Sequence, residues 1–338
     1  MQVYLSLDVE LFFGARSGTP ERCIIEPLSA IEQLSVKRGA FLTLFIDAGY
    51  LCALKRASAT NVVARQDLQK LSVFLGGLSR RGHDLQLHIH PHWEDAELNG
   101  ANWRFPLHRY KLDDFSLTDA DDIIDRYGNA IAELSGNRPF AYRAGGWCMP
   151  DFSRYGQAFL RHGVWLDSTA FAGGVEQSAS HSFDFRELPE LDLWRFSDDV
   201  SVADANGPFV EIPIAATRAS PAHYWAVALR RKLGGAEHRP FGNGAAVPSP
   251  AGSLFRKLVA PSACVISVDG SKSSLLAAAL RRRRKSNPNA HFVVMGHPKA
   301  VTRNSLRDLE RFLDMVPEDE FSTFSGNREA IRHQVGLA

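Results

Sequence analysis

The chain alternates between short apolar runs and longer amphipathic stretches. Apolar runs at residues 3–7 and 40–46, and alternating apolar positions at 84–88, have the length and composition of strands. Residues 27–38 and 68–78 repeat apolar positions every three or four residues, which is the spacing of a helix with one buried face. Strand, helix and strand in this order predict βαβ units, in which parallel strands lie in one sheet.

The same alternation continues over most of the chain. Further predicted elements are helices at 119–134, 152–162 and 306–316, and strands at 140–142, 164–166 and 290–295. Repeated strands and helices favour an α/β fold with a parallel sheet closed as a (β/α) barrel. With 338 residues, the chain is long enough for one large core, so we expect a single domain over 1–338. Residues 170–285 break the rhythm with Gly-, Ser- and Pro-rich pieces, which predict long inserted loops.

Composition narrows the choice of partner. The 39 Lys and Arg residues nearly balance 38 Asp and Glu, a net charge of +1, so no nucleic-acid partner is expected. The amino terminus lacks a basic signal region and no apolar stretch is long enough for a membrane span, which predicts a cytoplasmic protein without a transmembrane segment. Four scattered cysteines without CxxC spacing suit a reducing compartment. The basic run from Arg281 to Lys285 predicts a solvated helix end or a peripheral contact with anionic lipid.

Ionisable side chains follow three of the predicted strands. They are Asp8 and Glu10, then His88, His90 and His92, then His297. Barrels and open α/β sheets keep their active sites at the carboxyl ends of strands, so we expect these groups to lie together. A carboxylate with two imidazoles is typical of a catalytic zinc or a similar divalent metal, which keeps a coordination position for water. Because Asp8 and Glu10 are two residues apart, one can hold the metal while the other handles a proton.

The order of four motifs resembles the NodB-homology polysaccharide deacetylases, carbohydrate esterase family 4. The motifs are Asp8-Val-Glu10, Gly82-His-Asp leading into His88-x-x-x-His92, Tyr142-Arg143-Ala-Gly-Gly-Trp147 and Val294-Met-Gly-His297, and together they span most of the chain. The second is the most specific. The resemblance implies a distorted (β/α) barrel and a metal-dependent hydrolase that removes an acyl group, usually acetyl, from a saccharide substrate. An intracellular intermediate of surface polysaccharide metabolism is the expected substrate class.

Site roles follow from the resemblance residue by residue. It implies that Asp8 is the general base, His297 the general acid and Arg143 the group that orients Asp8. It implies that His88 and His92 bind the metal. The family commonly has a second aspartate after the base, but Val9 stands there in this chain and cannot bind a metal, so Glu10 is expected to take that place.

Two histidine pairs remain open from the residues themselves. An extended backbone would put His88, His90 and His92 on one face, whereas a helical turn would pair only His88 with His92. Pro91 disfavours the helical conformation at His90. The family pattern makes His90 a substrate contact, and a His88/His90 ligand pair is the alternative.

Other candidates lie beside these motifs. Asp167 follows a predicted strand and is expected to orient His297, with a helix-capping role as the alternative. Asp47 also follows a strand and is expected to bind sugar hydroxyls, or else to cap a helix. Trp93 and Trp147 adjoin motifs and are expected to stack on a sugar.

The sequence leaves alternatives open for both the metal and the function. Zinc is the expected metal, while cobalt, nickel and manganese accept the same ligands. Val9 also suits a catalytically inactive saccharide-binding relative. A third alternative is a glycosidase that uses Asp8 and another carboxylate without metal, which predicts activity insensitive to chelators.

Overall fold

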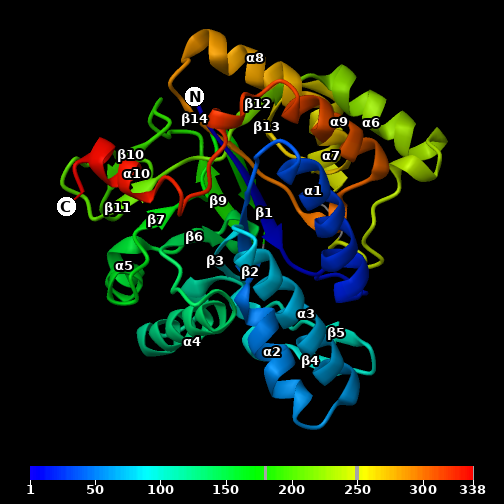
Figure 1. Cartoon of the computed structure of the whole chain (residues 1–338), viewed down its shortest axis with the longest axis vertical. Helices are drawn as coiled ribbons and strands as arrows, with labels where there is room; N and C mark the ends of the chain where they lie inside the picture. Colours follow the sequence, from blue (N-terminus) through cyan, green and yellow to red (C-terminus); the bar gives the residue numbers. More distant parts are fainter. Residues whose placement is uncertain (179–180, 248–250, 338) are drawn as a thin grey trace.

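The computed structural model describes residues 1–178, 181–247 and 251–337. At its centre is a curled sheet of eight strands surrounded by helices (Figure 1). From one edge to the other, the strands are β10 (Trp194–Phe196), β11 (Phe209–Glu211), β7 (Leu166–Asp167), β6 (Ala141–Ala144), β3 (Asp84–Ile89), β2 (Leu42–Asp47), β1 (Gln2–Val9) and β14 (His291–Val294). Neighbouring strands are parallel except β10 and β11. The predicted α/β barrel-type fold is confirmed.

The barrel is distorted where its edges meet. Beyond β11 the chain crosses to the free edge of β14, where Ile214 pairs with Val293 and the Ala215 N–H donates to the Val293 carbonyl at 2.9 Å. Ser267 forms another single bridge, with Met295. Isolated bridges therefore stand where a regular barrel would have a complete strand ladder.

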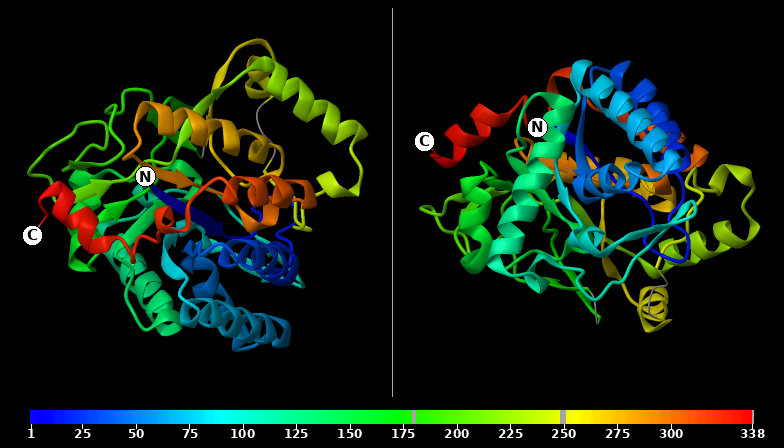
Figure 2. Two further views of the ribbon diagram at one scale, coloured as in Figure 1. Left: turned by 45° about the horizontal axis from the view of Figure 1, so that its top comes forward. Right: turned by 90° about the horizontal axis from the view of Figure 1, so that it is seen from below.

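Helices cover the outside of the sheet (Figures 1 and 2). They are α1 (Glu26–Val36), α2 (Ala48–Ser58), α3 (Val62–Arg80), α4 (Leu117–Ser135), α5 (Phe152–Arg161), α8 (Leu276–Ser286), α9 (Arg303–Leu313) and α10 (Arg328–Val335). Side chains set several of their starts, since Asn61 accepts a hydrogen bond from the Ala64 N–H and Ser116 accepts one from the Asp119 N–H. The helices predicted at 27–38, 68–78, 119–134, 152–162 and 306–316 are confirmed, with ends shifted by a few residues. Among the described residues, no helix combines the length and apolar composition needed to cross a bilayer.

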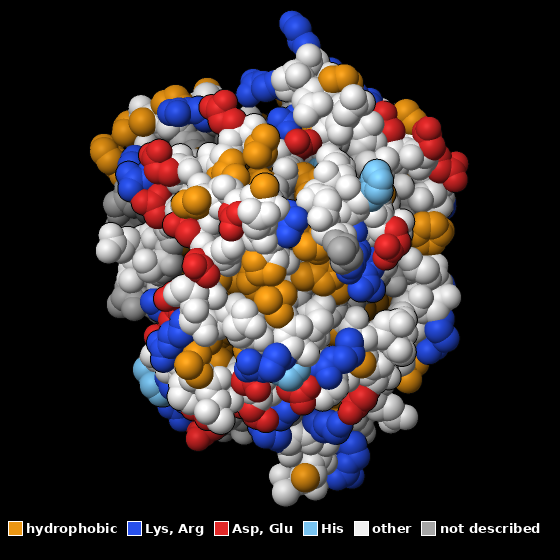
Figure 3. Space-filling view, turned by 90° about the vertical axis from the view of Figure 1, so that its left-hand side faces the viewer, with side chains coloured by type: hydrophobic (Ala, Val, Ile, Leu, Met, Phe, Trp, Pro, Cys, Tyr) orange, Lys and Arg blue, Asp and Glu red, His pale blue; other side chains and the backbone are white. Residues whose placement is uncertain are grey.

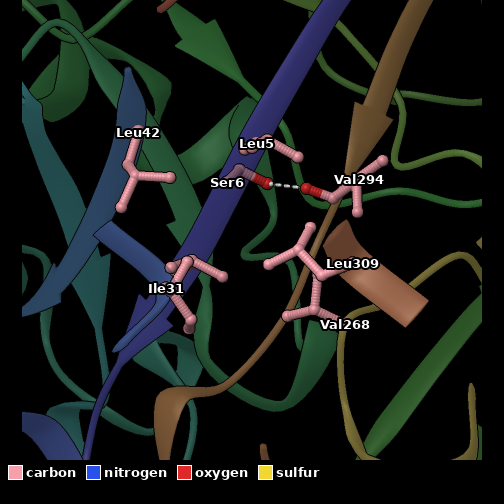
Figure 4. Close-up of a pocket in the computed structure, with 8 residues that line it drawn as sticks. Leu5, Ser6, Ile31, Leu42, Val268, Val294 and Leu309 are labelled. Atoms are coloured by element: carbon pink, nitrogen blue, oxygen red, sulfur yellow. Dashed lines mark hydrogen bonds between the residues drawn. The ribbon is translucent and has the colours of Figure 1, made fainter. Parts of the chain in front are cut away.

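Alternate residues of β1 face two different environments. Leu5 points outward, where it packs with Leu42 and Val294 against Ile31 of α1 and Leu309 of α9 without room for a water molecule (Figure 4). Tyr4 belongs to a separate apolar cluster with residues of β2, β6, β7, β11 and β14, inside the curl of the sheet. Ser6 and Asp8 share the side of Tyr4 because strand side chains alternate. The interior therefore changes from apolar to polar toward the carboxyl ends of the strands.

Residues 170–285, expected as long inserted loops, contain more regular structure than that. They form the hairpin β8 (Gly174–Gln177) and β9 (Ser182–Phe185), the strands β10 and β11, the ribbon β12 (Ala216–Ala219) and β13 (Ser262–Val265), and the helices α6 (Pro221–Leu233), α7 (Ala251–Val259) and most of α8. A small hairpin, β4 (Glu97–Asn99) and β5 (Asn102–Arg104), lies earlier in the chain. Strands of three or four residues are too short to leave a clear period in the sequence, which explains why the strands of this region were not predicted.

Candidate active site

Asp8 lies at the carboxyl end of β1, where Arg143 of β6 fixes its carboxylate. The Arg143 guanidinium donates to Asp8 Oδ1 at 2.7 Å, to Ser6 Oγ at 2.9 Å and to the Ser168 carbonyl at 2.7 Å. Arg143 is buried, so these bonds hold its fork in one orientation. Asp8 Oδ2 is left facing His297, whose Nε2 lies 3.7 Å away. The contact predicted between Arg143 and Asp8 is present.

Glu10 directly follows β1 and brings three cationic or imidazole groups together. Its Oε2 lies 2.6 Å from His90 Nε2 and 3.3 Å from His88 Nε2, and its Oε1 accepts a hydrogen bond from Lys299 Nζ at 2.8 Å. Burial opposes ionisation of this carboxyl, but Lys299, His90 and His88 together outweigh it and hold the pKa of Glu10 well below its usual range. Glu10 is therefore a carboxylate.

The surroundings of His88 suit either a protonated ring or a bound cation, because burial disfavours the charged imidazole but Asp8, Glu10 and Asp47 outweigh it and raise the pKa of His88. His88 Nδ1 lies 2.9 Å from the Arg143 carbonyl, which can only accept, so Nδ1 carries a proton. In a neutral imidazole Nε2 then presents a lone pair to the Glu10 carboxylate, and two acceptors face each other at 3.3 Å. Either a second proton on His88 or a cation between the two atoms resolves this conflict.

One ligand atom from each of Glu10, His88 and His90 lies within 4.8 Å of the other two. His90 Nε2 is close to Glu10 but has no hydrogen-bonding geometry, and neither nitrogen of this buried ring has a hydrogen-bond partner among the described residues. Burial lowers the pKa of His90 to about 4, so its ring is neutral and can act as a ligand. Three protein ligands of this kind fit a divalent metal with an open coordination position.

His92 lies outside this group. Its ring stacks on Tyr110 at 5.1 Å and meets Phe13 edge-on at 4.5 Å. The chain is extended at His90 and turns into a short 3₁₀ segment at Pro91. The His92 ring lies beside that of His90, with centroids 5.1 Å apart, but His92 does not join the Glu10–His88–His90 group. The structure thus brings together the His88/His90 pair, the alternative to the His88/His92 pair implied by the family pattern.

His297 follows β14 and has a carboxylate of its own. Asp269 accepts a hydrogen bond from His297 Nδ1 at 2.8 Å and another from the His297 backbone N–H at 2.6 Å. Burial disfavours the charged imidazole, but Asp269, Glu10 and Asp8 outweigh it and raise the pKa of His297. The same ion pair lowers the pKa of Asp269 to about 2 despite its burial.

The expected partner of His297, Asp167, is elsewhere. Asp167 accepts hydrogen bonds from the Thr169 backbone and hydroxyl at 2.7 and 3.0 Å, and it interacts with Glu211 on the neighbouring strand. Burial raises the pKa of both carboxyl groups, that of Glu211 well above its usual range. The prediction that Asp167 orients His297 is corrected, because β7 is five strands away from β14, which His297 follows, whereas the segment of Asp269 lies beside the end of β14 through the Ser267–Met295 bridge.

Two of the expected sugar contacts are buried. Trp93 is 0% exposed and donates from Nε1 to Asp47 Oδ2 at 2.6 Å, so neither residue presents a face to solvent. Burial raises the pKa of Asp47 to about 8. The prediction that Trp93 stacks on a sugar is wrong for this geometry, since Trp103 and Phe105 enclose it. Trp147 is half-buried against Phe171 and Phe183, and it remains a candidate contact.

Sequence reasoning missed Lys299 and Asp269. Lys299 lies two residues after His297, donates also to the Leu11 carbonyl, and has its ammonium 5.0 and 4.9 Å from the rings of Phe12 and Phe13. A sequence signal for Asp269 was present, because this residue follows the largely apolar run 264–268 as Asp8 follows the run 3–7. Lys299 had none, since a buried lysine is indistinguishable in sequence from a solvated one.

Comparisons with known proteins identify the fold. Neither the protein-family models nor the curated proteins contain a match to this chain. Among solved structures, a Mycobacterium smegmatis protein named as a polysaccharide deacetylase matches with a TM-score of 0.54 at 18% identity, over 98% of this chain and 90% of that one. A probable polysaccharide deacetylase from Pseudomonas aeruginosa PAO1 matches with a TM-score of 0.50 at 12% identity, over 98% and 90%. The chain therefore has the polysaccharide deacetylase fold.

The same fold occurs under another name. The Puue allantoinase structure matches with a TM-score of 0.51 at 12% identity, over 99% of this chain and 90% of that one. Because similar barrels carry different activities, the fold does not select the substrate. Function therefore has to be inferred from the side chains of the site.

Proposed function

We propose that this protein is a metal-dependent hydrolase that removes an acyl group, most simply acetyl, from a saccharide. The observation that carries the proposal is one mouth of the barrel at which an Arg143-held Asp8, the Glu10–His88–His90 group and an Asp269-held His297 converge. Acyl hydrolysis needs a base, a proton donor and stabilisation of negative charge at the acyl oxygen. These three groups match those three needs.

Glu10, His88 and His90 would hold the metal. A divalent cation at this site supplies Lewis-acid polarisation of the acyl carbonyl and a lower pKa for water. Zinc is the first choice for a carboxylate with two imidazoles, and cobalt, nickel and manganese accept the same donors. His88 is oriented for this role by the Arg143 carbonyl.

The proton transfers belong to Asp8 and His297. Asp8 takes a proton from the attacking water at Oδ2, while Arg143 occupies Oδ1 and keeps the carboxylate in place. His297 points Nε2 into the site, and its raised pKa favours the imidazolium that can protonate the leaving nitrogen or oxygen. Asp269 stabilises that imidazolium through Nδ1.

One observation favours a second candidate, a saccharide-binding relative without turnover. Lys299 already donates to Glu10, so the carboxylate has a cationic partner in the absence of metal. A glycosidase is less well supported, because the low pKa of Glu10 makes it a poor proton donor.

Metal analysis and acetate release test the proposal. We expect about one transition metal per chain, loss of activity with a chelator, and acetate release from N- or O-acetylated sugars, with acylated intermediates of surface polysaccharides as the first substrates to try. A metal-free protein that binds saccharide but releases no acetate would instead support the second candidate. Chelator-insensitive release of acetate would contradict the metal dependence while leaving the hydrolase in place.

A further inference from the structure

The helices α6 and α7 project from the barrel between the strands β12 and β13 (Figures 1 and 2). None of the described residues of α6 is buried. The two helices contact each other, and Trp225 Nε1 of α6 donates to the Leu258 carbonyl of α7 at 3.1 Å. They form a helical pair with little cover from the rest of the chain that the structure describes.

Large apolar side chains of this pair are exposed. Trp225, Leu229 and Leu233 follow one another at i, i+4 and i+8, which places them on one face of α6, and Phe255 and Val259 repeat the same spacing on α7. These five side chains are between 58% and 72% exposed. Exposed apolar side chains gathered on one face in this way are typical of an interaction surface.

The charge of this segment is strongly one-sided. Residues 216–260 contain seven basic residues, Arg218, Arg230, Arg231, Lys232, Arg239, Arg256 and Lys257, against one acidic residue, Glu237. The excess of six positive charges compares with +1 for the whole chain. By contrast, the side of the molecule away from α6 intersperses charges of both signs (Figure 3). The helical pair therefore combines an exposed apolar stripe with an excess of cations.

We propose that α6 and α7 dock this protein on an anionic phospholipid surface. Trp, Leu and Phe side chains on one face, flanked by Lys and Arg, are the composition of helices that lie in the membrane interface. The apolar stripe would enter the acyl boundary while the cations meet lipid phosphates. A second copy of the chain is a poorer partner for this face, since it would bring the same positive charge against it.

The docking surface is connected to the wall of the active site. After α6 the chain returns to the barrel, where the Phe241 N–H donates to the Val301 carbonyl at 2.9 Å and the Gly242 N–H donates to the Lys299 carbonyl at 3.1 Å. A side chain at Gly242 or Gly244 would collide with Phe12, so the segment lies directly on the Phe12–Lys299 side of the site. Membrane docking would therefore bring the mouth of the barrel near the bilayer. Access to a lipid-linked acylated saccharide is a consequence that rests on the proposed function.

The basic run from Arg281 to Lys285 on α8 is less available for contact with lipid than its sequence implies. Arg284 pairs with Glu320 and Arg283 lies 3.6 Å from Asp192, while Arg281, Arg282 and Lys285 are exposed. Arg282 donates to Thr217 Oγ1 of β12 at 3.2 Å, which places this run beside the base of the helical pair. It can add positive charge to the lipid contact but carries no apolar stripe of its own.

Vesicle flotation tests the proposal on the full chain. We expect the wild type to float with vesicles of phosphatidylcholine and phosphatidylglycerol and not with phosphatidylcholine alone, and salt to weaken binding. Leu229→Ser/Leu233→Ser should weaken partitioning at least about tenfold, and Arg230→Ala/Lys232→Ala should weaken it about fivefold for each charge removed. These variants spare Trp225, which joins the two helices.

A matched control uses exposed apolar residues elsewhere. Val62→Ser/Val73→Ser removes two side chains of α3 that are similarly exposed, and it should bind vesicles as the wild type does. A wild type that fails to float, or α6 variants that float unchanged, would overturn the proposal. The wild type could instead self-associate without binding vesicles, and lose this self-association in Leu229→Ser/Leu233→Ser. That outcome would assign the face to a second copy of the chain and would equally overturn the proposal. None of these readouts depends on turnover, so failure of the docking proposal is distinguishable from failure of the proposed function.

Discussion

His90 and His297, in the two halves of the candidate site, differ in the charge that their surroundings favour. In the Glu10–His88–His90 half, two imidazoles share one carboxylate oxygen, and burial keeps His90 neutral with a pKa of about 4. In the His297 half, one imidazole has Asp269 to itself, and its pKa is raised. A neutral ring with a free lone pair suits a metal, whereas a charged ring suits proton donation. The number and placement of the carboxylates around each ring decide whether that ring is neutral or charged.

The test with the largest expected effect compares substitutions of Asp8, which lies in β1, and of Glu10, which directly follows it. Asp8→Asn should lower kcat by about a thousandfold because the base is lost, while the metal content stays at the wild-type level. Glu10→Gln should lose both the metal and the activity, since it removes the anionic ligand. Elemental analysis and acetate release on both variants check this. If the Glu10→Gln variant retained the metal, the anionic ligand of the metal would have to be another residue.

The second test compares His90 with His92. Loss of a side chain that only orients a ligand costs about 10–100-fold in metal affinity, so His90→Ala, which removes a ligand, should cost at least as much. His92→Ala should keep metal affinity within a few-fold of the wild type, because its ring lies outside the group. Competition with a chelating dye measures both. The reverse pattern would restore the pair expected from the family motif.

The third test changes the pH dependence through Asp269. His297 acts as an acid when protonated, so activity should fall as pH rises through its pKa. Asp269→Asn removes the largest interaction that raises this pKa, so the alkaline limb of kcat should move to lower pH. Asp167→Asn serves as the control and should leave that limb in place. A shift in the control alone would favour Asp167 as the partner.

The smallest expected effect concerns Lys299. Lys299→Met should destabilise the metal-free protein by about 3 kcal/mol, because Glu10 is left as a buried carboxylate without its lysine. Metal should then raise Tm more in this variant than in the wild type, since the cation replaces the lost charge. Lys55→Met, at an exposed ion pair with Glu133, should leave Tm nearly unchanged. Equal metal-induced shifts in Lys299→Met and wild type would show that Lys299 and the metal do not compete for Glu10.

Much of the fold was predictable from local pattern. The strands of the barrel core are continuous apolar runs because both of their faces are covered, and the helices at 117–135 and 303–313 carry apolar stripes with side-chain caps at Ser116 and Thr302. The strands of the hairpins in 170–285 were not predicted, since they have only three or four residues. The helices α6, α7 and α8 were not predicted either, although they have 13, 9 and 11 residues.

The sequence by itself determined which ionisable groups lie at the strand ends, namely Asp8, Glu10, the three histidines and His297, while the resemblance to the deacetylases added Arg143. Strand periodicity and the common edge of a parallel sheet are local rules, so the pattern of the chain is enough to locate those groups. Only the tertiary structure decided their partners. It left His92 outside the Glu10–His88–His90 group, gave His297 to Asp269 rather than Asp167, enclosed Trp93 and brought Lys299 to Glu10. The place of His92 depends on the local turn at Pro91. The other three contacts join residues far apart in the sequence, so they depend on how the whole sheet curls and packs and not on the pattern of any one segment.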